Sequence, residues 1–283
     1  MIRIDITKTI RQLAPCLLAA VACSCSGHKS DSAINHTEPV APIVSFCRSI
    51  DYRDTASLHK DKIMDEYMTG IVKLMMKSDS TSTSRALEIF FLGLNGDGKS
   101  LRSAARHANL YLDNPASPVK DETLYIRFLE SLLTSDNIPE DVSYKAREWM
   151  RKAKLNRQGT IANDFRYIDR KGNEGTLHAL EGEQTLLVFY DPECPHCPEI
   201  LKRIATDPKV NAAIDAGRLK VLAVYAEGKK DVWENDKETL PSHWTVAYDL
   251  TGVLDNELYD LPAMPIVYLL DAEKRVIIKD MPW

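Results

Sequence analysis

The residues best suited to chemistry in this sequence are two cysteines, Cys194 and Cys197, separated by Pro195 and His196. They follow an apolar run at residues 186–190, which predicts a buried strand, and they precede a helical pattern at residues 199–206. A cysteine near the start of a helix meets unpaired backbone N–H groups and the positive end of the helix dipole, and both stabilise a thiolate. A second cysteine close by can complete a disulfide exchange, so the spacing predicts a redox-active dithiol.

Each member of the motif has an expected role. We expect Cys194 to be the attacking thiol and Cys197, one turn deeper, to resolve the mixed disulfide. Pro195 suits the first helical turn, where its missing N–H costs nothing, and a protonated His196 would favour the thiolate further. The alternatives are a structural disulfide, a metal site and a merely solvated His196. Zinc would need four ligands, and the sequence has no second Cys/His pair at suitable spacing, so we expect no metal.

The first residues of the chain predict export. Residues 1–22 combine a basic start with an apolar core at residues 13–22, which is too short to span a bilayer. The core ends at Ala-Val-Ala before Cys23, which resembles the lipobox of bacterial lipoproteins, so residues 1–22 are expected to be a lipoprotein signal peptide and Cys23 the lipidated residue. Cys25 is a weaker candidate, and an ordinary secretory signal is the alternative. Residues 23–42 have the composition of a tether.

Composition limits the class of the folded part. The chain has 283 residues, 44% of them hydrophobic and 27% charged, which is typical of a globular protein with room for two domains. The net charge is −5 and no dense basic stretch occurs, so nucleic acid is not an expected partner. Cys47 stands alone in an apolar context and is expected to be a buried small side chain.

Residues 43–157 are expected to form an α-helical domain of unknown function. From residue 59 to residue 155, apolar residues recur at spacings of three and four and predict five helices joined by short turns. The Asn-Gly-Asp-Gly stretch at residues 95–98 predicts a turn rather than a calcium loop, because the acidic residue that a calcium loop needs downstream is missing. Core packing explains most of the aromatic and methionine side chains of this half, which are Tyr67, Met68, Met75, Met76, Phe90, Phe91 and Trp149.

Residues 160–283 have a different pattern. Strand-like runs at residues 165–168, 185–190, 219–225 and 244–248 alternate with helical ones, and residues 266–270 and 276–279 predict a closing antiparallel hairpin. This order predicts a mixed sheet flanked by helices, and the chain as a whole belongs to the α+β class.

This second half resembles the thioredoxin superfamily and, within it, the TlpA-like branch of exported, membrane-attached thiol–disulfide proteins. The matching features are Asn163-Asp164-Phe165, Asp169 with Gly172, the stretch at residues 189–197, and Met264-Pro265 before a strand. The resemblance implies an α/β thioredoxin-like domain in which Pro265 is cis and lies against the dithiol, while backbone groups of Met264 pair with an extended substrate. An ordinary trans proline is the alternative, and Pro262 is a competing candidate.

The resemblance also extends to the helical half and to the end of the sheet domain. The helical half is similar to an uncharacterised region of related bacterial lipoproteins. The family usually closes with a helix after the hairpin, so either that helix is dispensable or the earlier helices cover the sheet.

The expected function is a membrane-anchored thiol–disulfide oxidoreductase at the periplasmic face of the inner or outer membrane. Its partners would be thiols and disulfides of exported proteins and a membrane redox protein, with no cofactor beyond the Cys194–Cys197 disulfide. His196 favours an oxidising couple, whereas Asp191, Glu193 and the order of the domains favour a reductase or isomerase. The alternative is a non-enzymatic surface lipoprotein that binds a protein or glycan through its helical domain and carries a structural disulfide.

Overall fold

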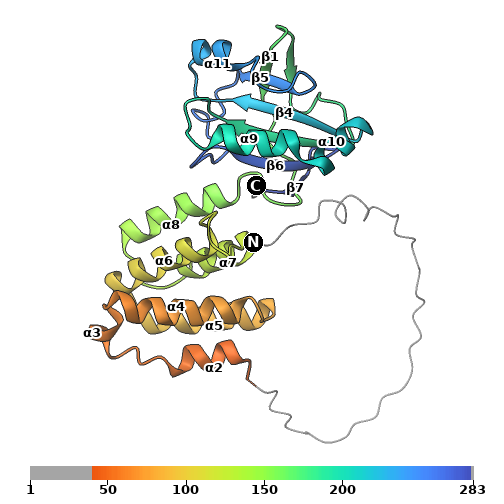
Figure 1. The fold of residues 1–283 in the computed structure, drawn as a ribbon. Helices are drawn as coiled ribbons and strands as arrows, with labels where there is room; N and C mark the ends of the chain where they lie inside the picture. Colours follow the sequence, from red (N-terminus) through yellow and green to blue (C-terminus); the bar gives the residue numbers. More distant parts are fainter. Residues whose placement is uncertain (1–39, 282–283) are drawn as a thin grey trace, which may run out of the picture.

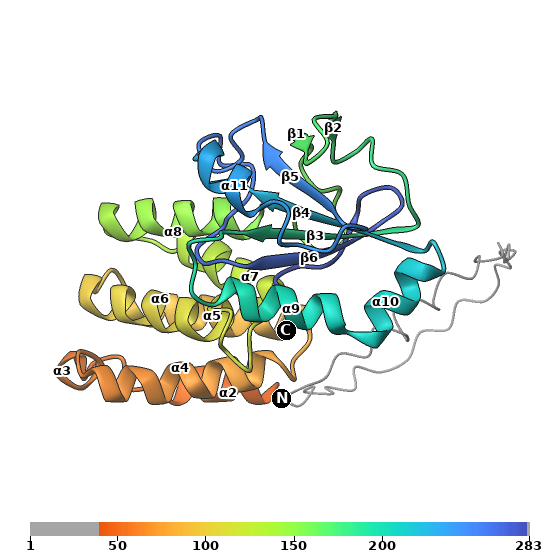
Figure 2. The ribbon, with the colours of Figure 1, turned by 45° about the horizontal axis from the view of Figure 1, so that its top comes forward.

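A computed structural model describes residues 40–281 of the chain. The expected signal peptide, most of the tether, Cys23 and Cys25 lie outside these residues. A group of helices comes first in the chain, and a sheet with helices follows (Figures 1 and 2). The predicted fold class is therefore confirmed. No helix among residues 40–281 is both long enough and apolar enough to cross a membrane.

The helical part contains the five expected helices, preceded by two short ones. Pro42 occupies the first turn of the first of these, where a missing N–H is tolerated. The helices lie side by side in layers (Figure 1). Their bounds are α2 Pro42–Ser49, α3 Thr55–Leu58, α4 Asp61–Met75, α5 Ser80–Leu94, α6 Gly98–Leu112, α7 Glu122–Leu133 and α8 Glu140–Ala153.

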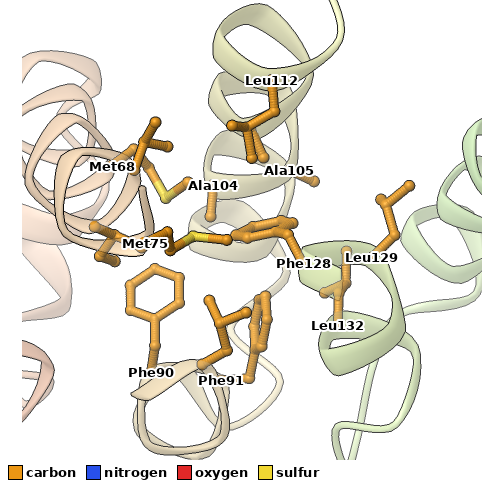
Figure 3. Close-up of a cluster of buried hydrophobic side chains, with 14 of the residues drawn as sticks. Met68, Met75, Phe90, Phe91, Ala104, Ala105, Leu112, Phe128, Leu129 and Leu132 are labelled. Atoms are coloured by element: carbon orange, nitrogen blue, oxygen red, sulfur yellow. The ribbon is translucent and has the colours of Figure 1, made fainter. Parts of the chain in front are cut away.

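The helices are held together by an apolar core that α4, α5, α6 and α7 share (Figure 3). The rings of Phe91 and Phe128 meet edge to face with their centroids 5.1 Å apart. Not all of the aromatic and methionine side chains expected in this core are fully buried. Met76 is half exposed, and Trp149 is only partly buried at the edge of the core. The expectation that core packing explains most of these side chains is therefore confirmed, and the pattern of apolar residues does not distinguish the edge of a helix face from its centre.

The turn at residues 95–98 closes α5 and opens α6. Asn95 adopts a left-handed conformation, with φ of 36°, and ends α5. Asp97 caps α6 by accepting a hydrogen bond from the Lys99 amide, and its carboxylate also accepts from Ser100 Oγ at 2.7 Å. His59 Nε2 lies 2.8 Å from the same carboxylate and joins α6 to the end of α3. The predicted turn is therefore confirmed, and its aspartate is a helix cap.

The second part is built on one seven-stranded sheet with the order β2-β1-β5-β4-β3-β6-β7. Strands β3, β4 and β5 run parallel, whereas β6 pairs antiparallel with β3. Strand β2 and helix α10 were not foreseen, because the three residues of β2 carry no apolar alternation and α10 has only eight residues. The bounds are β1 Arg166–Asp169, β2 Glu174–Thr176, β3 Gln184–Tyr190, α9 Cys197–Thr206, α10 Pro208–Asp215, β4 Leu219–Tyr225, α11 Lys230–Asp236, β5 Thr245–Asp249, β6 Ile266–Asp271 and β7 Val276–Ile278.

Both faces of the sheet are covered by residues of the second part itself. Helices α9 and α10, together with Trp233, pack on one face. The other face is covered by the segment before β1, through Ala162 and Phe165, and by the loop before β6, through Val253 and Tyr259. The apolar core of the helices is a separate cluster. Of the two alternatives, covering of this face by the earlier helices is not observed among the described residues, because the domain's own loops fill that place.

Polar contacts join the helices to the sheet domain. Asn156 donates a hydrogen bond to the Leu258 carbonyl at 2.8 Å, and the Lys279 ammonium donates to the Leu155 carbonyl at the same distance. Five ion pairs cross or flank the junction, and they join Lys120 to Asp280, Glu122 to Lys279 and to Arg157, Arg151 to Glu257, and Lys152 to Asp260. The relative position of the two parts is thus set by charge and hydrogen bonding rather than by a shared apolar core.

We predict that Asp97→Ala lowers the free energy of unfolding by about 1–2 kcal/mol at pH 7, because α6 loses its cap. Burial opposes ionisation of Asp97, but hydrogen bonds from Ser100 and His59 outweigh it and lower the pKa of this carboxyl. A lowered pKa contributes stability above the ordinary value of 3.8, and that contribution is lost as the pH falls through the folded value. Urea denaturation followed by circular dichroism at pH 7 and pH 3.5 measures both effects.

The control is Asp136→Ala, since Asp136 is exposed and caps no helix. Equal stability of the Asp97→Ala variant and the unmodified protein at pH 7 would contradict the capping role.

Candidate active site

The two cysteines lie where β3 ends and α9 begins, as expected. Strand β3 ends at Tyr190, a tight turn follows in which the Cys194 amide donates to the Asp191 carbonyl at 3.1 Å, and α9 begins at Cys197 with His196 as its cap. One detail differs from the expectation. Pro195 precedes the helix, and Pro198 is the proline in its first turn. The missing N–H that the first turn tolerates therefore belongs to Pro198.

The sulfur of Cys194 lies against Met264. Cys194 Sγ donates a hydrogen bond to the Met264 carbonyl at 3.3 Å, and the peptide between Met264 and Pro265 is cis. Strand pairing explains this proximity between residues that are 70 positions apart. Phe189, near the end of β3, is directly opposite Ile266, the first residue of β6. The residues just after β3 and just before β6 must therefore meet at the same edge of the sheet. Pro262 is not part of this contact.

The two thiols have unequal surroundings. Cys194 is partly exposed, whereas Cys197 is fully buried. Burial raises the pKa of the Cys197 thiol to about 12, and a hydrogen bond from the Asp191 backbone amide opposes this only in part. The neighbouring Cys194 sulfur and the Asp191 carboxylate also favour the protonated form of Cys197. Nucleophilic attack by a thiol requires its thiolate, so this asymmetry favours Cys194 as the first nucleophile.

Charged groups surround the pair. The Glu193 carboxylate, next to Cys194, forms an ion pair with Lys229 at 2.7 Å. The Lys229 cation offsets the negative charge of Glu193. From the sequence alone, that charge was expected to oppose formation of a thiolate. The imidazole of His196 is exposed and makes no hydrogen bond or ion pair with the part of the chain that the structure describes. The structure thus brings Cys194, Cys197 and Met264 together, and it leaves the His196 side chain outside this group.

Two groups that affect the charge around the dithiol could not be predicted from the motif. They are the Asp191 amide and the Lys229 ammonium. Lys229 follows β4, the parallel neighbour of β3. The carboxyl ends of adjacent parallel strands lie at one edge of a sheet, so the strand order would have indicated that the loop after β4 lies beside the dithiol. No local spacing in the sequence reveals this, because Glu193 and Lys229 are 36 residues apart.

A cavity of about 440 Å³ lies beside the dithiol on the side of α9 and α11. Cys197, Leu201 and Leu240 supply apolar surface to its wall, and Asp191 and Asp236 supply carboxylates. Residues 40–281 contain no group of three or more His, Cys, Asp or Glu side chains arranged to hold a metal ion. The remaining described cysteine, Cys47, is fully buried in the separate core of the helices.

We predict that iodoacetamide modifies the reduced protein at Cys194 and leaves Cys197 unmodified at pH 7. Cys194 is partly exposed, and Cys197 is buried with its pKa raised to about 12. Peptide mass spectrometry over a pH series measures the modified fraction of each cysteine. Urea-unfolded protein is the control and should be modified at both positions. Equal rates at the two cysteines in the folded protein would contradict the assignment.

Comparison with known proteins identifies the helical part first. Residues 46–156 match the model of a family described as a domain of unknown function (DUF5106). No curated protein sequence matches the chain.

Solved structures resemble the chain over its whole described length or over part of it. A thioredoxin-like protein from Bacteroides caccae is 24% identical, with a TM-score of 0.76, and the match covers 92% of this chain and 96% of that one. The C-terminal domain of an uncharacterized protein from Bacteroides fragilis is 37% identical over 45% of this chain and 91% of its own, with a TM-score of 0.44. A match over nearly the full length of both chains shows a common arrangement of helices and sheet. The chain thus joins a helical domain that matches the DUF5106 family to a C-terminal domain with the thioredoxin-like fold.

Proposed function

We propose that this protein is a thiol–disulfide oxidoreductase that acts through Cys194 and Cys197. The observation that carries the proposal is the placement of a partly exposed sulfur at the end of β3, beside a buried second thiol and the Met264 carbonyl. A structural disulfide would need neither an accessible sulfur nor a neighbouring backbone acceptor. This arrangement supplies both.

The proposed exchange proceeds in two displacements. The Cys194 thiolate attacks one sulfur of a substrate disulfide, the substrate S–S bond breaks, and one substrate thiolate leaves and takes up a proton. Cys197 then loses its proton and attacks the Cys194 sulfur, which releases the second substrate thiol. The substrate disulfide is reduced to two thiols, and the protein dithiol is oxidised to a Cys194–Cys197 disulfide. The reverse sequence oxidises a substrate dithiol.

The hydrogen bond to Met264 links the state of the sulfur to substrate binding. In the reduced protein, the Cys194 thiol donates its hydrogen to the Met264 carbonyl. A sulfur in a mixed disulfide has no hydrogen to donate. The carbonyl is then free to accept an N–H from an extended substrate chain, as the resemblance implies for this position. Met264 and Pro265 would thus form the substrate groove.

The proposal includes a location at a membrane of the cell envelope. The sequence before residue 40 has the features of a lipoprotein signal ending at Cys23. Two or more acyl chains on this residue would hold the protein at the periplasmic face of the inner or outer membrane. Exported proteins and a membrane redox protein would then be its exchange partners. We favour reduction or isomerisation as the reaction, because Asp191, Glu193 and the order of the domains indicate this direction.

We expect Cys194→Ser to abolish the dithiothreitol-coupled reduction of insulin, because no other described thiol combines exposure with a neighbouring resolving thiol. Cys47→Ala is the matched control and should keep the full rate, since Cys47 lies in the helical core. An unchanged rate in the Cys194→Ser variant would refute the catalytic role. A reduction potential below about −300 mV would instead favour a structural disulfide.

We also predict that Cys23→Ser moves the protein from the membrane fraction to the soluble fraction of expressing cells, because the acylated side chain is lost. Immunoblotting of the two fractions measures the shift, and Cys25→Ser serves as the control. Retention of the Cys23→Ser variant in the membrane fraction, with release of the Cys25→Ser variant, would assign the anchor to Cys25 and contradict the prediction.

A further inference from the structure

A second cavity, of about 400 Å³, lies at the junction of the helical domain and the thioredoxin-like domain. Its helical wall comes from α6, the segment after α6, and the last turns of α8. Its other wall comes from the loop before β6, through Asp260 and Pro262, and from Lys279 and Asp280 after β7. The cavity exists only where the two domains meet, so neither domain forms it alone.

The cavity is close to the proposed substrate groove. Pro262, in its wall, precedes Met264 by two residues, and Met264 accepts the hydrogen bond from Cys194 at 3.3 Å. Two residues of chain span at most about 7 Å. The Met264 carbonyl oxygen lies about 2 Å beyond its Cα. The edge of the cavity at Pro262 is therefore within about 13 Å of the reactive sulfur along this path, which is the length of about four residues of an extended peptide.

The charges in the cavity wall are paired with one exception. Three of its four carboxylates each contact a lysine of the same wall, in the pairs Asp260 with Lys152, Glu122 with Lys279, and Asp280 with Lys120. The remaining cation of the wall, Arg106, is paired with Asp61 outside it. The fourth carboxylate, Asp113, accepts a hydrogen bond from the side-chain amide of Asn109 at 3.0 Å. It has no ion pair within 4 Å in the described part of the chain.

The surroundings of Asp113 favour a further cation. Burial raises the pKa of its carboxyl, and the more distant Lys120 and Lys279 lower it less than burial raises it. A positive group that enters the cavity would stabilise the ionised form. The wall also offers apolar surface from Leu110, Pro262 and Trp149, whose ring already has the Lys145 ammonium 5.1 Å from its centroid. Such apolar surface suits the methylene groups of a long basic side chain.

We propose that this interdomain cavity binds a lysine or arginine side chain of a substrate polypeptide, about three to five residues from the cysteine that reacts with Cys194. Asp113 receives the positive charge, and Leu110, Trp149 and Pro262 contact the stem. The helical domain thereby selects the exchange partners of the dithiol. This inference rests on the proposed oxidoreductase function for its biological meaning, and the binding that it predicts can be measured without any redox step.

The test uses the full chain and fluorescently labelled ten-residue peptides with serine in place of the reactive cysteine. A single lysine, or a glutamine at the same position, is placed three, four or five residues to either side of the serine. Fluorescence anisotropy gives the dissociation constants. We expect the best lysine peptide to bind about three- to tenfold more tightly than its glutamine counterpart, as one charge-assisted contact provides. Asp113→Asn should reduce this ratio to about one.

The matched control is Asp136→Asn, which removes the same charge from an exposed site of the helical domain and should keep the preference for lysine. Equal binding of all lysine and glutamine peptides to the unmodified protein, or a preference that persists in Asp113→Asn, would overturn the proposal. So would binding of n-butylamine as tight as that of the lysine peptide, because the cavity would then be a site for small amines. Loss of insulin reduction would leave these binding results unchanged, so the two proposals fail separately.

Discussion

The antiparallel pairing of β3 with β6 is the constraint on which the site depends. It sets Phe189 opposite Ile266. The chain leaves β3 into the cysteine turn, and Met264 and Pro265 come directly before β6. A slip of one residue in this register would turn every side chain of the strand to the opposite face. Both faces of β3 are packed with apolar residues, so such a slip is prevented by the cores on either side. The register of β3 against β6 therefore brings Cys194 and Met264 into contact.

Burial, more than charge, distinguishes the two thiols. Cys197 is the first residue of α9 and points into the core between the helix and the sheet, whereas Cys194 stands in the turn outside it. Removal from solvent penalises the loss of the proton from the buried thiol, whereas exposure leaves the outer thiol open to a partner. The acidic residues around the motif do not act alone, because Lys229 from the loop after β4 neutralises Glu193. The order of events in the proposed exchange reaction rests on this difference in position.

The junction between the domains has a different physical character from either core. Each domain buries its own apolar cluster, and ion pairs and hydrogen bonds to backbone carbonyls join the two domains. Such contacts are directional, so they fix an orientation while leaving a polar hollow between the walls. The helical domain is thereby held next to the loop that leads to Met264. A domain whose family is described only as one of unknown function is thus placed where it can contact whatever reaches the dithiol.

Most helices, the central strands and the cysteine pair could be predicted from the sequence alone. The spacing of apolar residues located α4 to α8, the continuous apolar runs located β3 and β4, and the Cys-Pro-His-Cys stretch located the chemistry, because each of these signals is local. Contacts between residues far apart in the chain depend on the tertiary structure. It placed Lys229 against Glu193, left His196 exposed, filled the sheet face with Phe165 and Tyr259, and assembled the interdomain cavity around Asp113 and Trp149. Strand order and domain docking set these contacts, and a local pattern carries no information about which distant charges or loops will meet.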